Sequence, residues 1–336
     1  MIRSLSKFAI ILLFLFVITT PACLDSTDDA DLTIYSGRRE TLVAPVIERF
    51  SNASGLKVRV KYGESSHISA ILLEEGKKTK ADIFLAQDPA SLGSVLSLLT
   101  PLPSDILDQV PPWARSDVGL WVGVSARARV VAYNTKKYSD ADMPDDLMGF
   151  VERQWKDRMG WNPRSTSSQV MVTAMRVLWG ETKTLAWLNG LRANSTHIFA
   201  SNTSALAAVA SGEIDAAFVN HYYLHQALAQ TGADLPVANY HPRAGGPGAL
   251  IMVTGGGVLS TASHQANALE FLNFLLASES QDYFSNTLYE YPLKTDVRTS
   301  LASRSLSSIS HPRLNFEDLM DMGGTQRLLR ETGTIP

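Results

Sequence analysis

Two adjacent tyrosines, Tyr222 and Tyr223, follow Asn220 and His221 directly after an apolar run at residues 214–219. The run predicts a buried strand, and Asn220 is a residue type favoured as a helix N-cap, so both tyrosines are expected in a first helical turn. The positive end of a helix favours anions, phenolates included. Two phenolate oxygens suit a hard trivalent cation, because hard cations prefer oxygen ligands and only a strong Lewis acid deprotonates a phenol at neutral pH. The alternative is that the two rings pack between parts of the fold.

A second pair of candidate ligands is formed by His221 and His225, which are four residues apart and could share one helical face. This spacing occurs in zinc sites, but no glutamate follows His221 and no third ligand is in view. A partly exposed histidine pair is therefore the simpler interpretation, and an exported metal hydrolase stays as an alternative. The sequence contains no G-x-S-x-G, no H-E-x-x-H and no P-loop.

Two polar segments have the composition of anion sites at helix starts. Ser165, Thr166 and Ser167 precede a helix expected from about Gln169, and Asn202 precedes one expected at Ala205. Hydroxyls and free backbone N–H groups at a helix start bind anions, although each segment could equally be a plain cap.

Arg127 and Arg129 alternate within an extended run, so their side chains share one face of the expected strand. One of them could point into a cleft. The alternative is a pair of surface arginines.

The elements that must position these residues alternate between strand and helix signals, which predicts an α/β protein with largely parallel sheets. A run at 122–133 is long enough to cross between two lobes, and 250–253 is a second candidate crossing strand, flanked by glycines at 245–246 and 255–257. Helical or strand patterns are expected at 32–35, 42–50, 58–62, 68–73, 81–85, 159–161, 170–179, 185–191, 205–210 and 222–228, with a loop and helix at 143–155.

The composition is that of a globular protein of about two domains, with 336 residues, 45% hydrophobic and 19% charged. This composition excludes intrinsic disorder. Thirty basic and 33 acidic residues give a net charge of −3 without a long basic block, so no nucleic acid is expected as a partner.

Residues 1–22 have the pattern of an export signal, with Arg3 and Lys7 before an apolar stretch at 8–18 that is too short to span a bilayer. Removal of these residues leaves 28 basic and 33 acidic residues, a net charge of −5. Cys23 is the single cysteine, so no intramolecular disulfide is possible. Its position favours lipidation of a mature N-terminus, with ordinary cleavage after Ala22 as the alternative. Either way the protein is expected to act outside the cytoplasm.

Five segments resemble the ferric-iron substrate-binding proteins of bacterial ABC transporters, over most of the mature chain. They read LTIYSGRR at 32–39, ADIFLAQD at 81–88, SARARVVAYN at 125–134, IDAAFVNHYY at 214–223 and YEYP at 289–292. The resemblance implies a two-lobed periplasmic binding protein fold of type II, with two crossing hinge strands and a ligand cleft between the lobes. By resemblance, the first lobe takes residues 31–127 and 253–303, and the second takes 128–252 and 304–336.

The resemblance also implies roles for single residues. Tyr222 and Tyr223 match the paired iron ligands of the family. The residues that match the anion-binding loops and the cleft are Arg127, Ser165, Thr166, Ser167, Asn202 and Asn220.

Two positions depart from the family pattern. Arg39 stands where well-known members carry a histidine ligand, and Gln87 where they carry a glutamate. A guanidinium has no lone pair for a metal, so Arg39 is expected to hold an anion, and Gln87 could ligate only weakly through its carbonyl. Some members use a further tyrosine where this sequence reads Ser168-Gln169.

The resemblance therefore predicts a monomeric binding protein, not an enzyme, that captures Fe³⁺ with a synergistic anion such as carbonate for an ABC import permease. Binding of a ferric chelate, or of an organic or inorganic anion such as a phosphonate without free iron, is the alternative.

Overall fold

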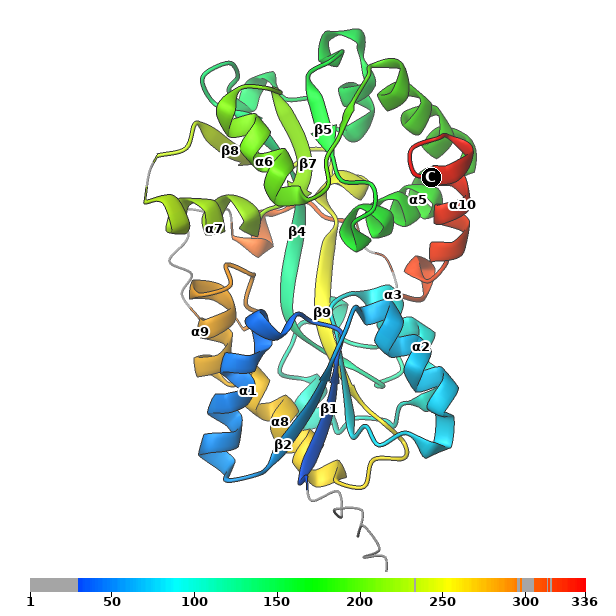
Figure 1. Ribbon diagram of the computed structural model, residues 1–336, viewed down its shortest axis with the longest axis vertical. Helices are drawn as coiled ribbons and strands as arrows, with labels where there is room; N and C mark the ends of the chain where they lie inside the picture. The colour runs from blue at the N-terminus through cyan, green and yellow to red at the C-terminus, as the bar shows by residue number, and fades with distance from the viewer. Residues whose placement is uncertain (1–29, 233, 295–296, 298–304, 313, 315) are drawn as a thin grey trace, which may run out of the picture.

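The structure is a computed structural model that describes residues 30–232, 234–294, 297, 305–312, 314 and 316–336. Two α/β lobes lie one above the other, and two strands run between them (Figure 1). The strand order is β2-β1-β3-β9-β4-β7-β5-β6, with β8 paired to β4, so one path of backbone pairing passes through both lobes. The two-lobed α/β architecture predicted from the sequence is confirmed.

The lower lobe in Figure 1 is built on three parallel strands, in which β1 pairs with both β2 and β3. The apolar residues of α1 recur at helical spacing and pack on this sheet, and Gly55 ends the helix with a φ of 73°, a left-handed conformation that glycine adopts without strain. The elements drawn in this lobe are β1 (Leu32–Ser36), β2 (Val58–Tyr62), β3 (Ile83–Ala86), α1 (Glu40–Ser54), α2 (Ser65–Glu75), α3 (Pro89–Ser94), α4 (Ser104–Leu107), α8 (Gln265–Leu276) and α9 (Ser278–Asn286).

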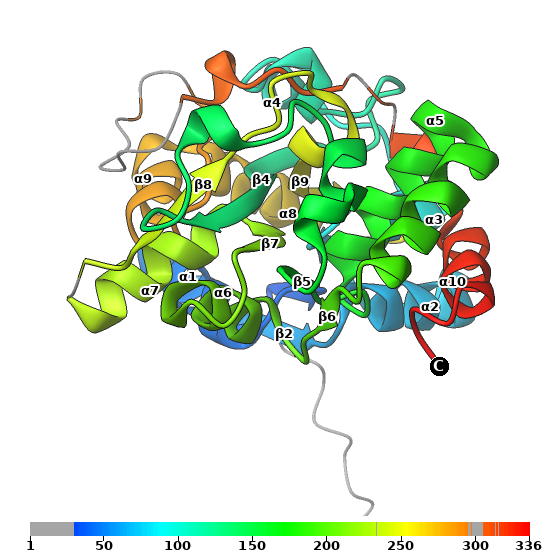
Figure 2. The ribbon, with the colours of Figure 1, turned by 90° about the horizontal axis from the view of Figure 1, so that it is seen from above.

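The upper lobe also has a parallel core, because β5 pairs in parallel with β6 and β7. Figure 2 shows α7 and α5 at opposite sides of this lobe, with α6 nearer to α7. Trp155, Trp161 and Trp187 pack with Phe150 and Phe218 in a separate aromatic core. The elements are β5 (Met159–Trp161), β6 (His197–Ile198), β7 (Ala216–Asn220), β8 (Val237–Tyr240), α5 (Thr166–Ala193), α6 (Asn202–Ser211), α7 (Tyr222–Thr231) and α10 (Met322–Glu331).

The two crossing strands are β4 (Val122–Asn134) and β9 (Ile251–Val258). Residues 122–128 of β4 pair antiparallel with β9, and from Arg129 onward β4 pairs with β7. All four pairings of β4 and β9 are antiparallel, so the prediction of largely parallel sheets holds only for the outer strands of each lobe. Glycines 255–257 lie inside β9 rather than beside it. A Cβ at Gly256 would come within 2.7 Å of Leu272, so close packing explains that glycine.

Helix boundaries differ from the prediction at several points. The patterns at 170–179 and 185–191 belong to one helix, α5, which is interrupted at Gly180 with φ 78° and ψ 166°. Residues 143–155 form short 3₁₀ turns instead of an α-helix. Within the described part of the chain, no helix has the length and apolar character needed to cross a membrane.

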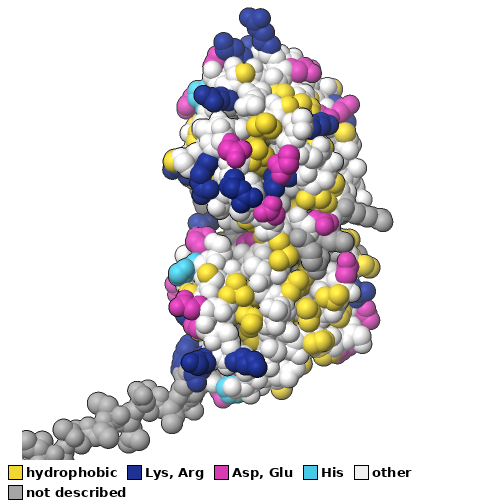
Figure 3. Space-filling view, turned by 90° about the vertical axis from the view of Figure 1, so that its right-hand side faces the viewer, with side chains coloured by type: hydrophobic (Ala, Val, Ile, Leu, Met, Phe, Trp, Pro, Cys, Tyr) yellow, Lys and Arg dark blue, Asp and Glu magenta, His cyan; other side chains and the backbone are white. Residues whose placement is uncertain are grey.

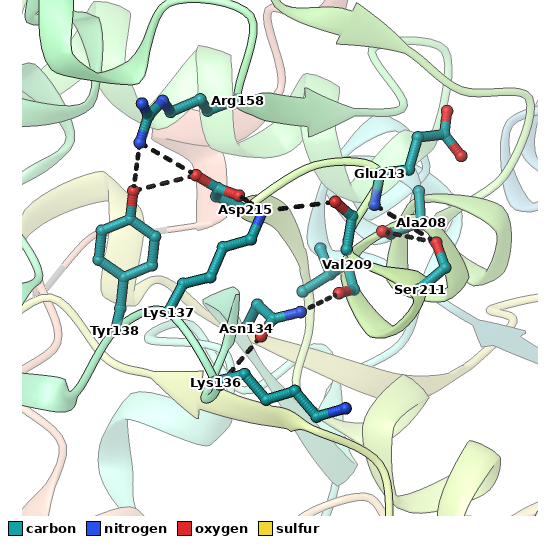
Figure 4. Close-up of polar contacts among 11 residues, drawn as sticks. Asn134, Lys136, Lys137, Tyr138, Arg158, Ala208, Val209, Ser211, Glu213 and Asp215 are labelled. Atoms are coloured by element: carbon teal, nitrogen blue, oxygen red, sulfur yellow. Dashed lines mark hydrogen bonds and ion pairs between the residues drawn. The ribbon is translucent and has the colours of Figure 1, made fainter.

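The entry to β7 is fixed by a buried carboxylate, Asp215 (Figure 4). It accepts hydrogen bonds from Tyr138 Oη at 3.0 Å and from Arg158 Nη1 at 3.4 Å, and it pairs with Lys137. Asn134, at the end of β4, donates to the Val209 carbonyl of α6 at 2.8 Å. These contacts tie the residue before β7 to the segments next to β4 and β5, and the end of β4 to α6.

The surface seen in Figure 3 carries basic and acidic side chains intermixed on the upper lobe. Arg176, for example, pairs with Glu181 at 2.6 Å and with Asp321 at 2.8 Å. This face therefore has no single-sign patch of the kind that binds nucleic acid.

Candidate functional site

The predicted site residues come from the carboxyl ends of the strands in both lobes. Parallel strands end at the same edge of a sheet, and ligands bind beyond that edge. In the upper lobe the chain leaves β5, β6 and β7 to enter α5, α6 and α7, and in the lower lobe it leaves β1 and β3 toward α1 and α3. Figure 1 shows α7 and the start of α5 at the underside of the upper lobe, next to the crossing strands. The fold therefore brings the predicted residues to the junction between the two lobes.

Tyr222 and Tyr223 lie at the start of α7, as predicted, with ring centroids 4.3 Å apart. The predicted cap is wrong, because Asn220 is the last residue of β7 and His221, with φ −56° and ψ −39°, occupies the N-cap position without a side-chain cap bond. The Asn220 side chain instead faces the site.

The Tyr222 side chain is buried, and its phenol is held in the neutral form. Burial raises the pKa of Tyr222, and the neighbouring Tyr223 raises it further, while Arg127 and a hydrogen bond with Asn220 oppose the shift. A cation at this position must therefore displace a tightly held proton, which only a strong Lewis acid can do.

Arg129 is fully buried and faces both the tyrosines and the start of α5. Its Nη1 donates to Asn220 Oδ1 at 2.9 Å and to Ser167 Oγ at 3.3 Å. Its Nε and Nη2 are buried without a hydrogen-bond partner. Burial lowers the pKa of Arg129 to about 10, against the opposing effect of Tyr223 and Tyr222, so the group stays charged at neutral pH. Among the described residues no carboxylate forms an ion pair with Arg129.

A buried guanidinium without a counter-ion is costly, by several kcal/mol when the charge is uncompensated. The sequence pattern places Arg127 and Arg129 on one strand face, and the family resemblance points to Arg127 as the arginine of the cleft. The structure shows that Arg129 is the one that contacts Asn220 and Ser167. The alternation along β4 indicates that both share a face, and the alternative of a surface pair is wrong, because both side chains are buried.

Arg127 contacts the loop that follows β3 in the lower lobe. Its Nη2 donates to the backbone carbonyl of Gln87, and its Nε is buried without a partner. The Gln87 N–H donates to Ser65 Oγ at 2.8 Å. Gln87 is thus held through its backbone, which leaves its side-chain amide outside these contacts.

The two polar helix starts are placed three residues earlier than predicted, at Thr166 and Asn202. Ser165 is the N-cap of α5, and its Oγ accepts from the Ser168 N–H at 3.3 Å, so this residue does act as a cap. Ser201, which was not predicted, caps α6 together with Ser204. Asn202 is buried at the first turn of α6, and its Oδ1 has no hydrogen-bond partner.

Arg39 lies exposed at the N-cap position of α1 and makes no cap bond. The adjacent Arg38 differs, because its guanidinium is buried in a bidentate pair with Glu290, at 2.8 and 3.0 Å, and also donates to Thr254 at 2.7 Å. Arg38 is therefore already neutralised, and Arg39 remains the basic group that this loop offers to a ligand.

The histidine pair does not have the geometry of a zinc site. His221 is buried, not partly exposed as expected, and its Nδ1 accepts the Ala128 N–H at 3.2 Å while its ring stacks on Tyr291. The His225 ring centroid is 6.4 Å away. In the part of the chain that the structure covers, no group of three or more His, Cys, Asp or Glu side chains could hold a metal. Cys23 lies outside the described residues.

Comparison with known proteins identifies the family. Residues 35–282 match the family model of the bacterial extracellular solute-binding proteins. The major ferric iron-binding protein of Neisseria meningitidis serogroup A is 32% identical, over 90% of this chain and 93% of that protein. The structure of iron-bound HitA from Pseudomonas aeruginosa superposes with a TM-score of 0.82 at 30% identity, covering 90% of this chain and 99% of that one.

A third similar structure is that of FutA (IdiA) from Trichodesmium in complex with iron and citrate ligands. It has a TM-score of 0.77 and 26% identity, over 90% of this chain and 99% of that one. These proteins share the two-lobed architecture, and the matched family consists of solute-binding proteins rather than enzymes. The chain belongs to the bacterial extracellular solute-binding protein family.

Proposed function

We propose that this protein captures Fe³⁺ outside the cytoplasm, with Tyr222 and Tyr223 as phenolate ligands and an exogenous anion completing the site, and delivers it to an ABC import permease. The relatives named above bind ferric iron or were determined with iron bound. In this protein the tyrosine pair lies at the junction between the two lobes. The observation that supports a bound anion is the buried charge of Arg129, which has no carboxylate partner among the described residues.

The charge balance calls for such an anion. Two phenolates reduce the charge of Fe³⁺ to +1, and neither Arg39 nor Gln87 brings a negative charge from the lower lobe. One carbonate would take the iron complex to −1, beside the buried guanidiniums of Arg127 and Arg129. The net attraction of this arrangement favours carbonate or another divalent oxyanion over a neutral ligand.

The residues proposed to hold the anion come from both lobes. They are Arg39, Arg127, Ser165, Thr166, Ser167, Asn202 and Asn220, and Gln87 is a possible weak ligand through its amide oxygen. Contacts of Arg129 with Ser167 and Asn220 support this set. The free N–H groups of the first turn of α5 add partial positive charge at the same edge.

A second candidate function is binding of an oxyanion, such as a phosphonate, without iron. The unpartnered nitrogens of Arg129 favour it, because they would attract an oxyanion whether or not a metal is present. A ferric chelate is the third form the ligand could take.

Cys23 would become the lipidated N-terminus of the mature chain, which lacks residues 1–22, and the lipid would tether a monomeric binding protein to the membrane beside its permease. The proposed lobes are 31–127 with 253–303, and 128–252 with 304–336. The change of pairing partner in β4 between Ala128 and Arg129 supports the first crossing point.

One experiment separates the candidates. Iron-stripped protein is mixed with Fe³⁺ together with bicarbonate, phosphate or citrate, and the visible spectrum is recorded. A phenolate-to-iron charge-transfer band is expected, and bicarbonate or phosphate should strengthen binding. If anions bind calorimetrically and no band forms with any iron source, the protein binds an anion without iron.

A further inference from the structure

An aromatic contact joins the helix that carries the tyrosine pair to a segment of the lower lobe. The ring of His221, at the N-cap position of α7, stacks on the ring of Tyr291, with centroids 4.3 Å apart and planes 13° from parallel. Tyr291 belongs to the segment that follows α9, a helix of the lower lobe, and both side chains are buried. The residue directly before Tyr222 therefore rests on a chain segment from the other lobe.

Both members of the stack are tied to the crossing strand β4, two residues apart. The Tyr291 N–H donates to the Ala126 carbonyl at 2.8 Å, and the Ala126 N–H donates to the Tyr291 carbonyl at 2.9 Å. The His221 N–H donates to the Ala128 carbonyl at 3.0 Å, and His221 Nδ1 accepts the Ala128 N–H at 3.2 Å. Backbone groups two residues apart on a strand point to the same edge, about 7 Å from each other, so the two rings meet beside β4.

Other contacts of α7 involve the same segment. Gln226 Nε2 donates to the Leu288 carbonyl at 3.5 Å, and the His225 ring centroid lies 6.2 Å from that of Tyr289. Tyr289 has a φ of 61°, a left-handed conformation that is uncommon for a residue with a side chain. Such a backbone persists only where the surrounding contacts fix it. Residues 288–291 are therefore held in a defined arrangement against α7.

We propose that the His221–Tyr291 stack favours the arrangement of the two lobes seen here, and that His221 is a positioning residue for the tyrosine pair. The β4 strand pairs with β9 up to Ala128 and with β7 from Arg129 onward, so a hinge motion at this point would turn α7 relative to Tyr291. The rings would then separate, and opening of the cleft would lose their attraction. An aromatic pair of this kind shifts an equilibrium by about three- to tenfold. The consequence for ligand release rests on the proposed iron site, whereas the consequence for the lobes does not.

Two variants remove the stack, and two controls retain it. Tyr291→Leu replaces one ring by an aliphatic side chain, and His221→Gln removes the other ring while its amide oxygen can still accept the Ala128 N–H. Tyr291→Phe retains the ring. Phe199→Leu removes the partner of another histidine stack, with His197, which lies within the upper lobe. Thermal melting shows which of the four proteins fold.

The first measurement is the distance between two spin labels, one on each lobe, in the iron-free mature protein. The labels are attached through Ala53→Cys on α1 and Thr182→Cys on α5, both at exposed positions, in a Cys23→Ser background. The two stack-removing variants should populate more open distances about three- to tenfold more than the unaltered protein, and the two controls should match it. Unchanged distances in a folded stack-removing variant, or an equal change in a control, would overturn the inference.

The second measurement is the release of Fe³⁺, bound with bicarbonate, to a competing chelator, followed by the loss of the charge-transfer band. The stack-removing variants should retain the band, because both phenolates remain, and should release iron about three to ten times faster than the unaltered protein. Release at the unaltered rate would show that His221 does not position the tyrosines. If the distances shift as expected but no band forms with any iron source, the iron site fails and the contact between the lobes stands.

Discussion

Arg129 and Asn220 are direct cross-strand partners in β4 and β7, and the guanidinium of Arg129 donates a 2.9 Å hydrogen bond to the amide oxygen of Asn220. Asn220 in turn interacts with Tyr222, where it partly offsets the rise in the pKa of the phenol. Arg129, Asn220 and Tyr222 therefore form one chain of contacts from the buried guanidinium to the proposed metal ligand. An anion bound at Arg129 and a metal bound at Tyr222 would be coupled through it.

The first prediction concerns anion binding by the iron-free protein. Arg129→Gln should reduce the affinity for bicarbonate or phosphate by about tenfold or more, because hydrogen bonds to a charged group contribute about 1.5–3 kcal/mol. The check is the rise in melting temperature on adding either anion. Arg158→Gln is the matched control, since Arg158 lies in the Asp215 cluster of Figure 4, with its side chain half exposed. An anion response that survives in Arg129→Gln would contradict the assignment.

The second prediction concerns colour. Tyr222→Phe or Tyr223→Phe should abolish or strongly shift the phenolate-to-iron band, because each removes one of the two proposed phenolates. Tyr138→Phe removes a phenol in the upper lobe that hydrogen-bonds Asp215 and should leave the band unchanged. A normal spectrum in both site variants would show that the tyrosines are not ligands.

Much of this arrangement could be predicted from the sequence, because it depends on local patterns. The continuous run in β4 indicated a crossing strand, and the apolar run before Asn220 indicated the strand that positions the tyrosines. The starts of α5 and α6 were placed three residues late. Serine, threonine and asparagine favour caps over helix interiors, so a first helical turn made of these residues is predicted as a loop.

The role of Arg129 could not be derived in this way. Two arginines two residues apart share a strand face, and their residue type and spacing do not rank them. Their roles differ only because β4 changes partners between Ala128 and Arg129, so that Arg129 meets β7 and the start of α5 while Arg127 meets Gln87. That difference is set by tertiary contacts and not by the local sequence. Arg39 and Tyr222 line one cavity although they are far apart in the sequence, so their proximity also depends on tertiary contacts.

The third prediction is pH dependence. Burial and Tyr223 raise the pKa of Tyr222, so below that pKa the iron-free phenol holds its proton and must lose it when iron binds. Iron affinity should therefore rise with pH and fall as the solution is acidified. Tyr222→Phe should release one proton fewer per iron than the unaltered protein, measured in weakly buffered solution at fixed anion. Identical proton release in the two proteins would contradict a Tyr222 phenolate.

The fourth prediction concerns the lower lobe. Arg39→Ala should keep the tyrosine band, since a guanidinium is no metal ligand, but weaken iron binding and make it less dependent on the added anion. Titrations with and without bicarbonate provide the test. The idea fails if iron binds the unaltered protein as tightly in anion-depleted buffer as with bicarbonate, because the protein would then supply its remaining ligands itself.

The fifth prediction concerns anchoring. Cys23→Ser should move the protein from the membrane fraction to the soluble exported fraction, because the cysteine thiol is the proposed site of lipid attachment. Fractionation of cells that express each form gives the answer. Full solubility of the unaltered exported protein would exclude the anchor.

The change of partner within β4 has a consequence for ligand sensing. Arg127 belongs to the stretch paired with β9 and reaches the lower lobe, whereas Arg129, two residues later, belongs to the stretch paired with β7. Any bend of the backbone between them changes the separation of two buried positive charges. An oxyanion that contacts both would hold that separation at one value, so the occupancy of the cleft would set the angle of the hinge through electrostatic attraction within a single strand.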